Sequence, residues 1–77
     1  MKKLTFYHAG CPVCVGAEND VIQLLGADAL DIVHLREDRG RIQEAEGKGV
    51  KSVPALVMPN GNVLHINYGA SMEDVKG

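Results

Sequence analysis

The clearest structural signal lies in residues 4–14, which read LTFYHAGCPVC. The run of β-favouring residues in its first half predicts a strand over residues 2–8. A short turn follows, and Pro12 then occupies the first turn of a helix, where the missing N–H of proline is not needed. The segment therefore predicts a strand that leads into a helix, with Cys11 and Cys14 placed where that helix begins.

Outward from this segment, apolar residues recur at helical spacing over residues 12–25, and Gly26 is a plausible end for the helix. One stripe of this helix is expected to be buried, and it consists of Cys14, Ala17, Val21 and Leu24, with Leu25 close by.

The remaining residues predict five more elements. They are a strand over 30–35, a short helix over 38–47, a strand over 54–58, a strand over 63–68 after an Asn60-Gly61 turn, and a last helix opened by a capping box of Ser71 and Asp74. The order β-α-β-α-β-β-α predicts an α/β fold in one domain, 1–77. It consists of a four-stranded mixed sheet with helices on its faces.

Composition limits the possible functions. The chain has 77 residues and a net charge of −2, so it has no basic excess of the kind that nucleic-acid binding usually requires. No stretch approaches the ~20 apolar residues of a membrane span, and the N-terminus does not resemble a signal peptide. We expect a cytoplasmic protein that binds neither nucleic acid nor membrane.

The two cysteines are the only ones in the chain. They would close too small a loop to stabilise the fold much as a disulfide, so a redox-active or metal-binding pair is expected. At a helix N-terminus a cysteine pKa falls from ~8.5 into the range ~3.5–7.5. Cys11, at the tip of the helix, is therefore the expected nucleophile, and Cys14, one turn further in, is the expected resolving thiol.

A metal-binding module is the alternative interpretation, with copper, zinc or an iron–sulfur cluster held by Cys11 and Cys14. His8 adds a third possible ligand, but a closed zinc site needs four. The fourth would have to be His34 or His65, if the fold brings either of them near.

Pro54 opens its strand, which is a position that proline tolerates. This strand is expected to run antiparallel to the first, so its start lies at the same sheet edge as the cysteines. A trans Val53–Pro54 bond would make it a simple strand start. A cis bond would turn the N–H and C=O of Val53 towards the site, as a docking edge for an extended substrate.

Two segments carry a family resemblance. Residues 6–14 resemble the active-site segment of glutaredoxins, in which proline directly follows the first cysteine, and residues 49–57 resemble the thioredoxin segment that carries a cis-proline. The chain is thus identified as a short, glutaredoxin-sized member of the thioredoxin-fold superfamily. The resemblance implies a minimal thioredoxin fold, a cis Pro54, and a Val53 that pairs with the substrate main chain.

The resemblance also implies a function. The expected activity is thiol–disulfide oxidoreduction on protein disulfides by a monomer with no bound cofactor. A thioredoxin-reductase-like flavoenzyme or glutathione would supply electrons. Pro12 and Val13, between the cysteines, are expected to contact substrate together with Val53 and Pro54.

The chain departs from the family pattern at three places. Gly10 stands where thioredoxins carry a tryptophan, and Thr5 and Phe6 occupy the region where thioredoxins bury an aspartate. His8 is the nearest equivalent of the basic residue found in glutathione-binding glutaredoxins.

Overall fold

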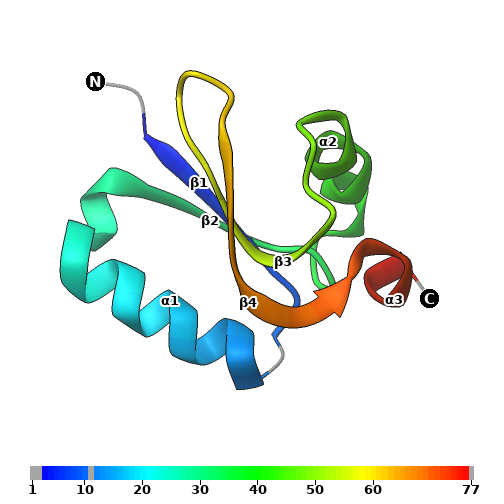
Figure 1. Ribbon diagram of the computed structural model, residues 1–77, viewed down its shortest axis with the longest axis horizontal. Coiled ribbons are helices and arrows are strands. Elements are labelled where there is room, and N and C mark those ends of the chain that lie inside the picture. The colour runs from blue at the N-terminus through cyan, green and yellow to red at the C-terminus, as the bar shows by residue number, and fades with distance from the viewer. Residues whose placement is uncertain (1–2, 11, 77) are drawn as a thin grey trace.

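The computed structural model describes residues 3–10 and 12–76, with only the backbone described at 67 and 68. Its elements are β1 (Leu4–His8), α1 (Pro12–Leu25), the 3₁₀ turn η1 (Ala27–Ala29), β2 (Leu30–His34), the 3₁₀ turn η2 (Arg39–Arg41), α2 (Ile42–Gly47), β3 (Ser52–Val57), β4 (Val63–Ser71) and α3 (Met72–Lys76). The predicted α/β fold is confirmed, with helices on both faces of the sheet (Figure 1).

The four strands form a mixed sheet in the order β2-β1-β3-β4. β1 and β2 are parallel and in register from Leu4/Leu30 to His8/His34, as expected for the two strands of a β-α-β unit. β3 runs antiparallel to both β1 and β4. Pro54 lies at the irregularity in β3–β4 pairing between Val53 and Ala55, where the absence of an N–H disturbs the ladder least.

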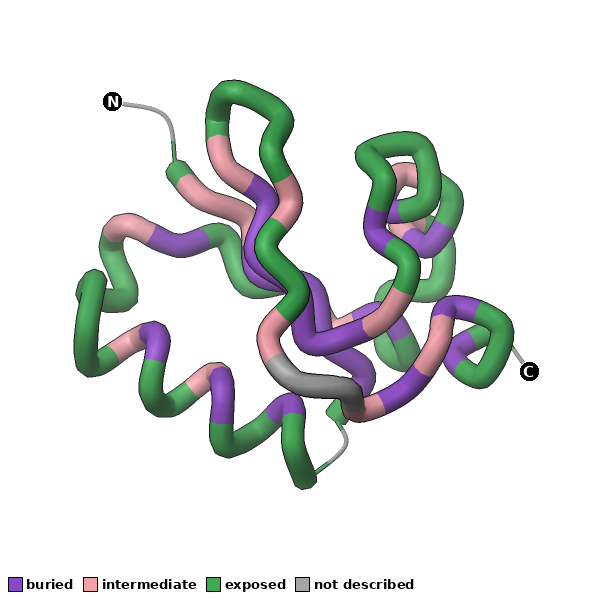
Figure 2. The backbone as a smooth tube through the Cα atoms, viewed as in Figure 1, coloured by how far each residue is buried: buried purple, intermediate pink, exposed green. Residues whose placement is uncertain are grey.

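Alternation along β1 sends neighbouring side chains to opposite faces of the sheet. Phe6 packs into a cluster with Ala17 and Val21 of α1. Tyr7 packs into the larger cluster on the other face, which includes Ile42 of α2 and Val75 of α3. Buried residues accordingly line the central strands and the helix sides that face them (Figure 2).

The stripe predicted for α1 is correct for Cys14, Ala17 and Val21 but wrong for Leu24, which is 82% exposed. A helix of 14 residues is about 21 Å long, whereas a five-residue strand such as β1 spans about 17 Å. The end of α1 therefore extends past the strands that cover its buried stripe.

The helix predicted over 38–47 is wrong in its first half, which forms the η2 turn, so that α2 begins only at Ile42. The strand predicted over 63–68 continues to Ser71. Ser71 then precedes α3, and its Oγ accepts the N–H of Asp74 at 3.2 Å while the Asp74 carboxylate accepts the N–H of Ser71 at 3.4 Å. The predicted capping box is present.

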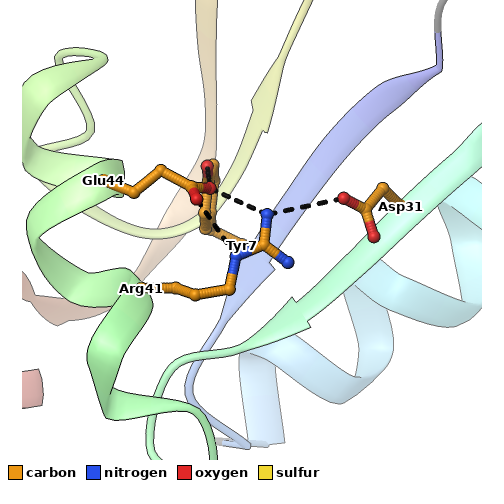
Figure 3. A network of polar contacts seen from close by, with 4 residues as sticks. All are labelled: Tyr7, Asp31, Arg41 and Glu44. Atoms are coloured by element: carbon orange, nitrogen blue, oxygen red, sulfur yellow. Dashed lines mark hydrogen bonds and ion pairs between the residues drawn. The ribbon is translucent and has the colours of Figure 1, made fainter.

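A polar network fixes α2 to the sheet (Figure 3). The Tyr7 hydroxyl donates to Glu44, and the Arg41 guanidinium donates twice to the same carboxylate. Arg41 also lies 3.5 Å from the Asp31 carboxylate on β2. Because α2 has only six residues, such contacts matter more for its stability than helix propensity does.

Side chains from η2 and α2 hold α3 in place. The Arg39 guanidinium donates to the carbonyls of Val75 and Lys76, at 3.4 and 2.6 Å. Lys76 Nζ lies 2.7 Å from a Glu46 carboxylate oxygen. These contacts tie the end of the chain to η2 and α2.

Of the helices in the described part of the chain, none combines the length and apolar character needed to cross a membrane.

Candidate functional site

The candidate site lies at the junction between the end of β1 and the start of α1. Cys14 is in the first turn of α1 and is completely buried, in one cluster with Ala9 and Val53. Cys11, the expected nucleophile, lies outside the described residues. The intervening Pro12 and Val13 are exposed, Val13 by 39%. The start of α1 thus presents an open surface at 12–13 and a buried thiol one residue further on.

The Val53–Pro54 peptide bond is cis, as the resemblance implies. The register between β1 and β3 matches Tyr7 with Ala55, so Val53 falls two positions beyond that pair, level with Ala9. Both Val53 and Pro54 are buried in this structure. A substrate main chain would therefore reach Val53 only if the residues that cover it moved aside.

His8, the last residue of β1, is a buried polar residue next to the turn. Its Nδ1 accepts the N–H of Gly10 at 3.3 Å, so in the neutral ring the proton is on Nε2, which lies 3.8 Å from the Glu18 carboxylate of α1. Burial lowers the pKa of His8 below its ordinary value of 6.5, although the Glu18 charge opposes that shift. His8 is therefore a neutral histidine that holds the turn through its acceptor nitrogen.

His34 ends β2 directly beside His8, and the two rings meet edge to face with their centroids 4.6 Å apart. The N–H of Glu37 donates to Nδ1 of His34 at 3.3 Å, which leaves the proton on Nε2. That nitrogen lies against Gly10, because a Cβ added at Gly10 would be only 2.6 Å from it. Gly10 has a φ of 76°, a second reason why the position favours glycine.

Two members of this cluster, His34 and Glu18, have no role at the expected redox site: His34 was considered only as a possible fourth metal ligand, and Glu18 was not considered. Signals for both exist in the sequence: the two parallel strands each end in histidine, and Glu18 follows Cys14 by one helical turn. His65, the other histidine considered as a ligand, instead accepts the N–H of Lys51 at 3.1 Å.

Comparison with known proteins identifies the family. The chain is similar to a dimeric thioredoxin-like protein from Nitrosomonas europea solved by solution NMR, with 55% sequence identity and a TM-score of 0.86. The match covers 97% of this chain and 95% of that one. This chain belongs to the thioredoxin-like proteins. A scan against protein-family models finds no match, and neither does a search of curated proteins.

In this thioredoxin-like protein the geometry accounts for one departure from the thioredoxin pattern. Thioredoxins carry a tryptophan before the first cysteine, and here the ring of His34 occupies the space into which a side chain at position 10 would project. The imidazole pair of His8 and His34 thus packs beside the turn before α1.

In the described part of the thioredoxin-like chain, no three His, Cys, Asp or Glu side chains are grouped so that they could hold a metal ion. A site built on both cysteines would include Cys11, which lies outside that part, so the metal-binding alternative stays a prediction.

Proposed function

We propose that this thioredoxin-like protein is a thiol–disulfide oxidoreductase that reduces protein disulfides, with Cys11 as nucleophile and Cys14 as resolving thiol. The observation that carries the proposal is the position of Cys14. It is buried in the first turn of α1, in one cluster with Val53, whose peptide bond to Pro54 is cis. A thiol at that depth is protected from external substrates and is three residues from its partner.

The reaction has two exchange steps. The Cys11 thiolate attacks one sulfur of the substrate disulfide, so a Cys11–substrate disulfide forms and the second substrate sulfur leaves as a thiolate that takes up a proton. The Cys14 thiolate then attacks the Cys11 sulfur, which closes the Cys11–Cys14 disulfide and releases the first substrate sulfur. Two electrons pass to the substrate, and a thioredoxin-reductase-like flavoenzyme or glutathione returns them.

Exposure supports the division of roles around the two cysteines. The exposed Pro12 and Val13 offer the accessible contact surface for a substrate segment. Val53 would add main-chain pairing once uncovered, beside Pro54. The helix N-terminus at Pro12 favours a thiolate in front of it, because the first N–H groups of a helix have no partner within the helix.

The test is insulin-disulfide reduction driven by dithiothreitol, with wild type beside Cys11→Ser and Cys14→Ser. We expect wild type to accelerate reduction, Cys11→Ser to be inactive, and Cys14→Ser to accumulate mixed disulfides with substrate. Equal loss of trapping in both variants would contradict the assignment of roles. Folded wild type that fails to accelerate reduction, together with bound metal or colour after purification, would favour the metal-binding alternative.

For assembly we propose a homodimer in place of the monomer expected from the sequence. The support is the dimeric state of the thioredoxin-like protein that shares 55% of its residues with this chain.

A further inference from the structure

One edge of the sheet is built from an uncharged strand. β4 is the terminal strand in the order β2-β1-β3-β4, and it lies in front of the other strands in Figure 1, so one of its two sides faces away from the sheet. Residues 63–71 read VLHINYGAS and include no Asp, Glu, Lys or Arg. Natural proteins usually protect exposed edges with charged residues or proline, so an uncharged edge is suited to pairing with another strand.

The register shows which backbone groups of β4 point outward. The N–H of Met58 donates to the carbonyl of Asn62 at 2.8 Å, and the carbonyl of Met58 accepts the N–H of Gly61 in the turn, so the hydrogen-bonded pair of Met58 and Asn62 shares one bond and opens the ladder. In an antiparallel ladder such pairs alternate with pairs that are not hydrogen-bonded. Leu64 therefore bonds to β3, whereas Val63 and His65 direct their N–H and C=O groups away from the sheet.

The straight part of this edge is short. β4 pairs in regular register with β3 from Val63 to His65, and the register then shifts before Ala70. Such irregularities bend a strand and interrupt further pairing. The available edge is thus the segment that begins at Val63, and within it the Leu64 side chain is 48% exposed.

The opposite edge is less suited to pairing. β2 has five residues, and Asp31 near its middle is exposed, 3.5 Å from the Arg41 guanidinium. Asp31 and Arg41 thus place charged side chains along this edge, and charged residues are a usual means of preventing an edge strand from pairing.

We infer that two copies of this chain pair through the segment Val63–Ile66 of β4, antiparallel around a two-fold axis. A strand edge is self-complementary under that symmetry, because each copy offers the same donors and acceptors to the other. The Leu64 side chains would meet across the axis. This inference rests on the proposed dimer and names its surface. The cysteine ends of the sheet would point away from the interface, so both sites would stay open.

The first experiment measures molar mass by size-exclusion chromatography with light scattering, over a range of protein concentrations. Wild type should approach twice the 8.3 kDa of one chain. Leu64→Lys should raise the dimer dissociation constant by about tenfold or more, because it places like charges opposite each other. Leu24→Lys is the matched control, since it makes the same change at a residue that is 82% exposed on α1, and it should leave the mass unchanged.

Amide hydrogen exchange then locates the interface. The amides of Val63 and His65 should be protected at high concentration and should lose that protection in Leu64→Lys, whereas the Leu64 amide of wild type should stay protected on dilution. A monomer at every concentration would overturn the dimer and its surface together. A dimer whose Val63 and His65 amides exchange freely would overturn the surface alone. Insulin reduction by the same samples reports separately on the redox function.

Discussion

Replacing Gly10 with alanine tests how closely His34 packs over the turn before Cys11. Two costs are expected. The first is conformational: a left-handed φ, here 76°, costs an L residue about 1–2 kcal/mol. The second is steric, because the new Cβ would lie 2.6 Å from Nε2 of His34. To make room the imidazole must swing away and give up the N–H of Glu37, a hydrogen bond with a net value of about 1 kcal/mol.

Gly61→Ala separates the two costs. Gly61 has a φ of 94° and nothing within 4 Å of its added Cβ, so this variant carries the conformational cost alone. We therefore expect Gly10→Ala to destabilise the protein by about 1 kcal/mol more than Gly61→Ala does. With a urea m-value of about 1 kcal/mol/M, the two unfolding midpoints should differ by about 1 M.

The assay is urea unfolding followed by circular dichroism, repeated in a His34→Ala background. Removing the imidazole should abolish the extra cost of Gly10→Ala and leave that of Gly61→Ala unchanged. Equal midpoints for the two glycine variants, or a difference that persists without His34, would refute the reasoning.

Three further predictions concern the polar groups of Tyr7, Glu44 and His8. Tyr7→Phe removes the hydroxyl that donates to Glu44 and should lower the free energy of unfolding by about 1 kcal/mol. The melting temperature should then fall by about 4–8 °C. An unchanged melting temperature would mean that this hydrogen bond adds nothing to the stability. Hydrogen bonds from Arg41 and Tyr7 lower the pKa of Glu44, so this part of the stability should be lost as pH falls below 4.5, and Tyr7→Phe should weaken that dependence. Burial lowers the pKa of His8, so the unfolded chain binds the proton more readily and the free energy of unfolding should fall as pH drops below 6.5. His8→Gln should flatten urea-unfolding stability between pH 7.5 and 5.5, and an unchanged slope would show that other groups cause it.

Local patterns in the sequence were sufficient for much of the fold. Runs of β-favouring residues and turn residues predicted all four strands, and the polar pair at Ser71 and Asp74 predicted the capping box that opens α3. The helical spacing of apolar residues wrongly predicted that Leu24 is buried, because this spacing does not indicate where the sheet beneath the helix ends. The helix predicted over 38–47 also began too early, because the chain first makes a 3₁₀ turn before Ile42.

At the candidate site, the burial of Cys14 was predictable from the sequence, but its surroundings were not. The buried position of Cys14 follows from its place on the apolar stripe of α1. The contact of His34 with Gly10 depends on the register of β1 against β2, and the bond between Tyr7 and Glu44 joins residues 37 positions apart. Pairings of this kind are set by tertiary packing, which spacing along the chain does not reveal.

Through the contacts of Arg39, the stability of α3 at the end of the chain depends on η2 in its middle. A five-residue helix is too short to be stable alone, and here the guanidinium from η2 takes up the carbonyls of Val75 and Lys76. When η2 opens, α3 loses its C-terminal cap and the Lys76–Glu46 pair is released with it. We therefore expect α2 and α3 to open together, whereas the buried side of α1 also packs, through Ala17 and Val21, into the cluster on the other face of the sheet.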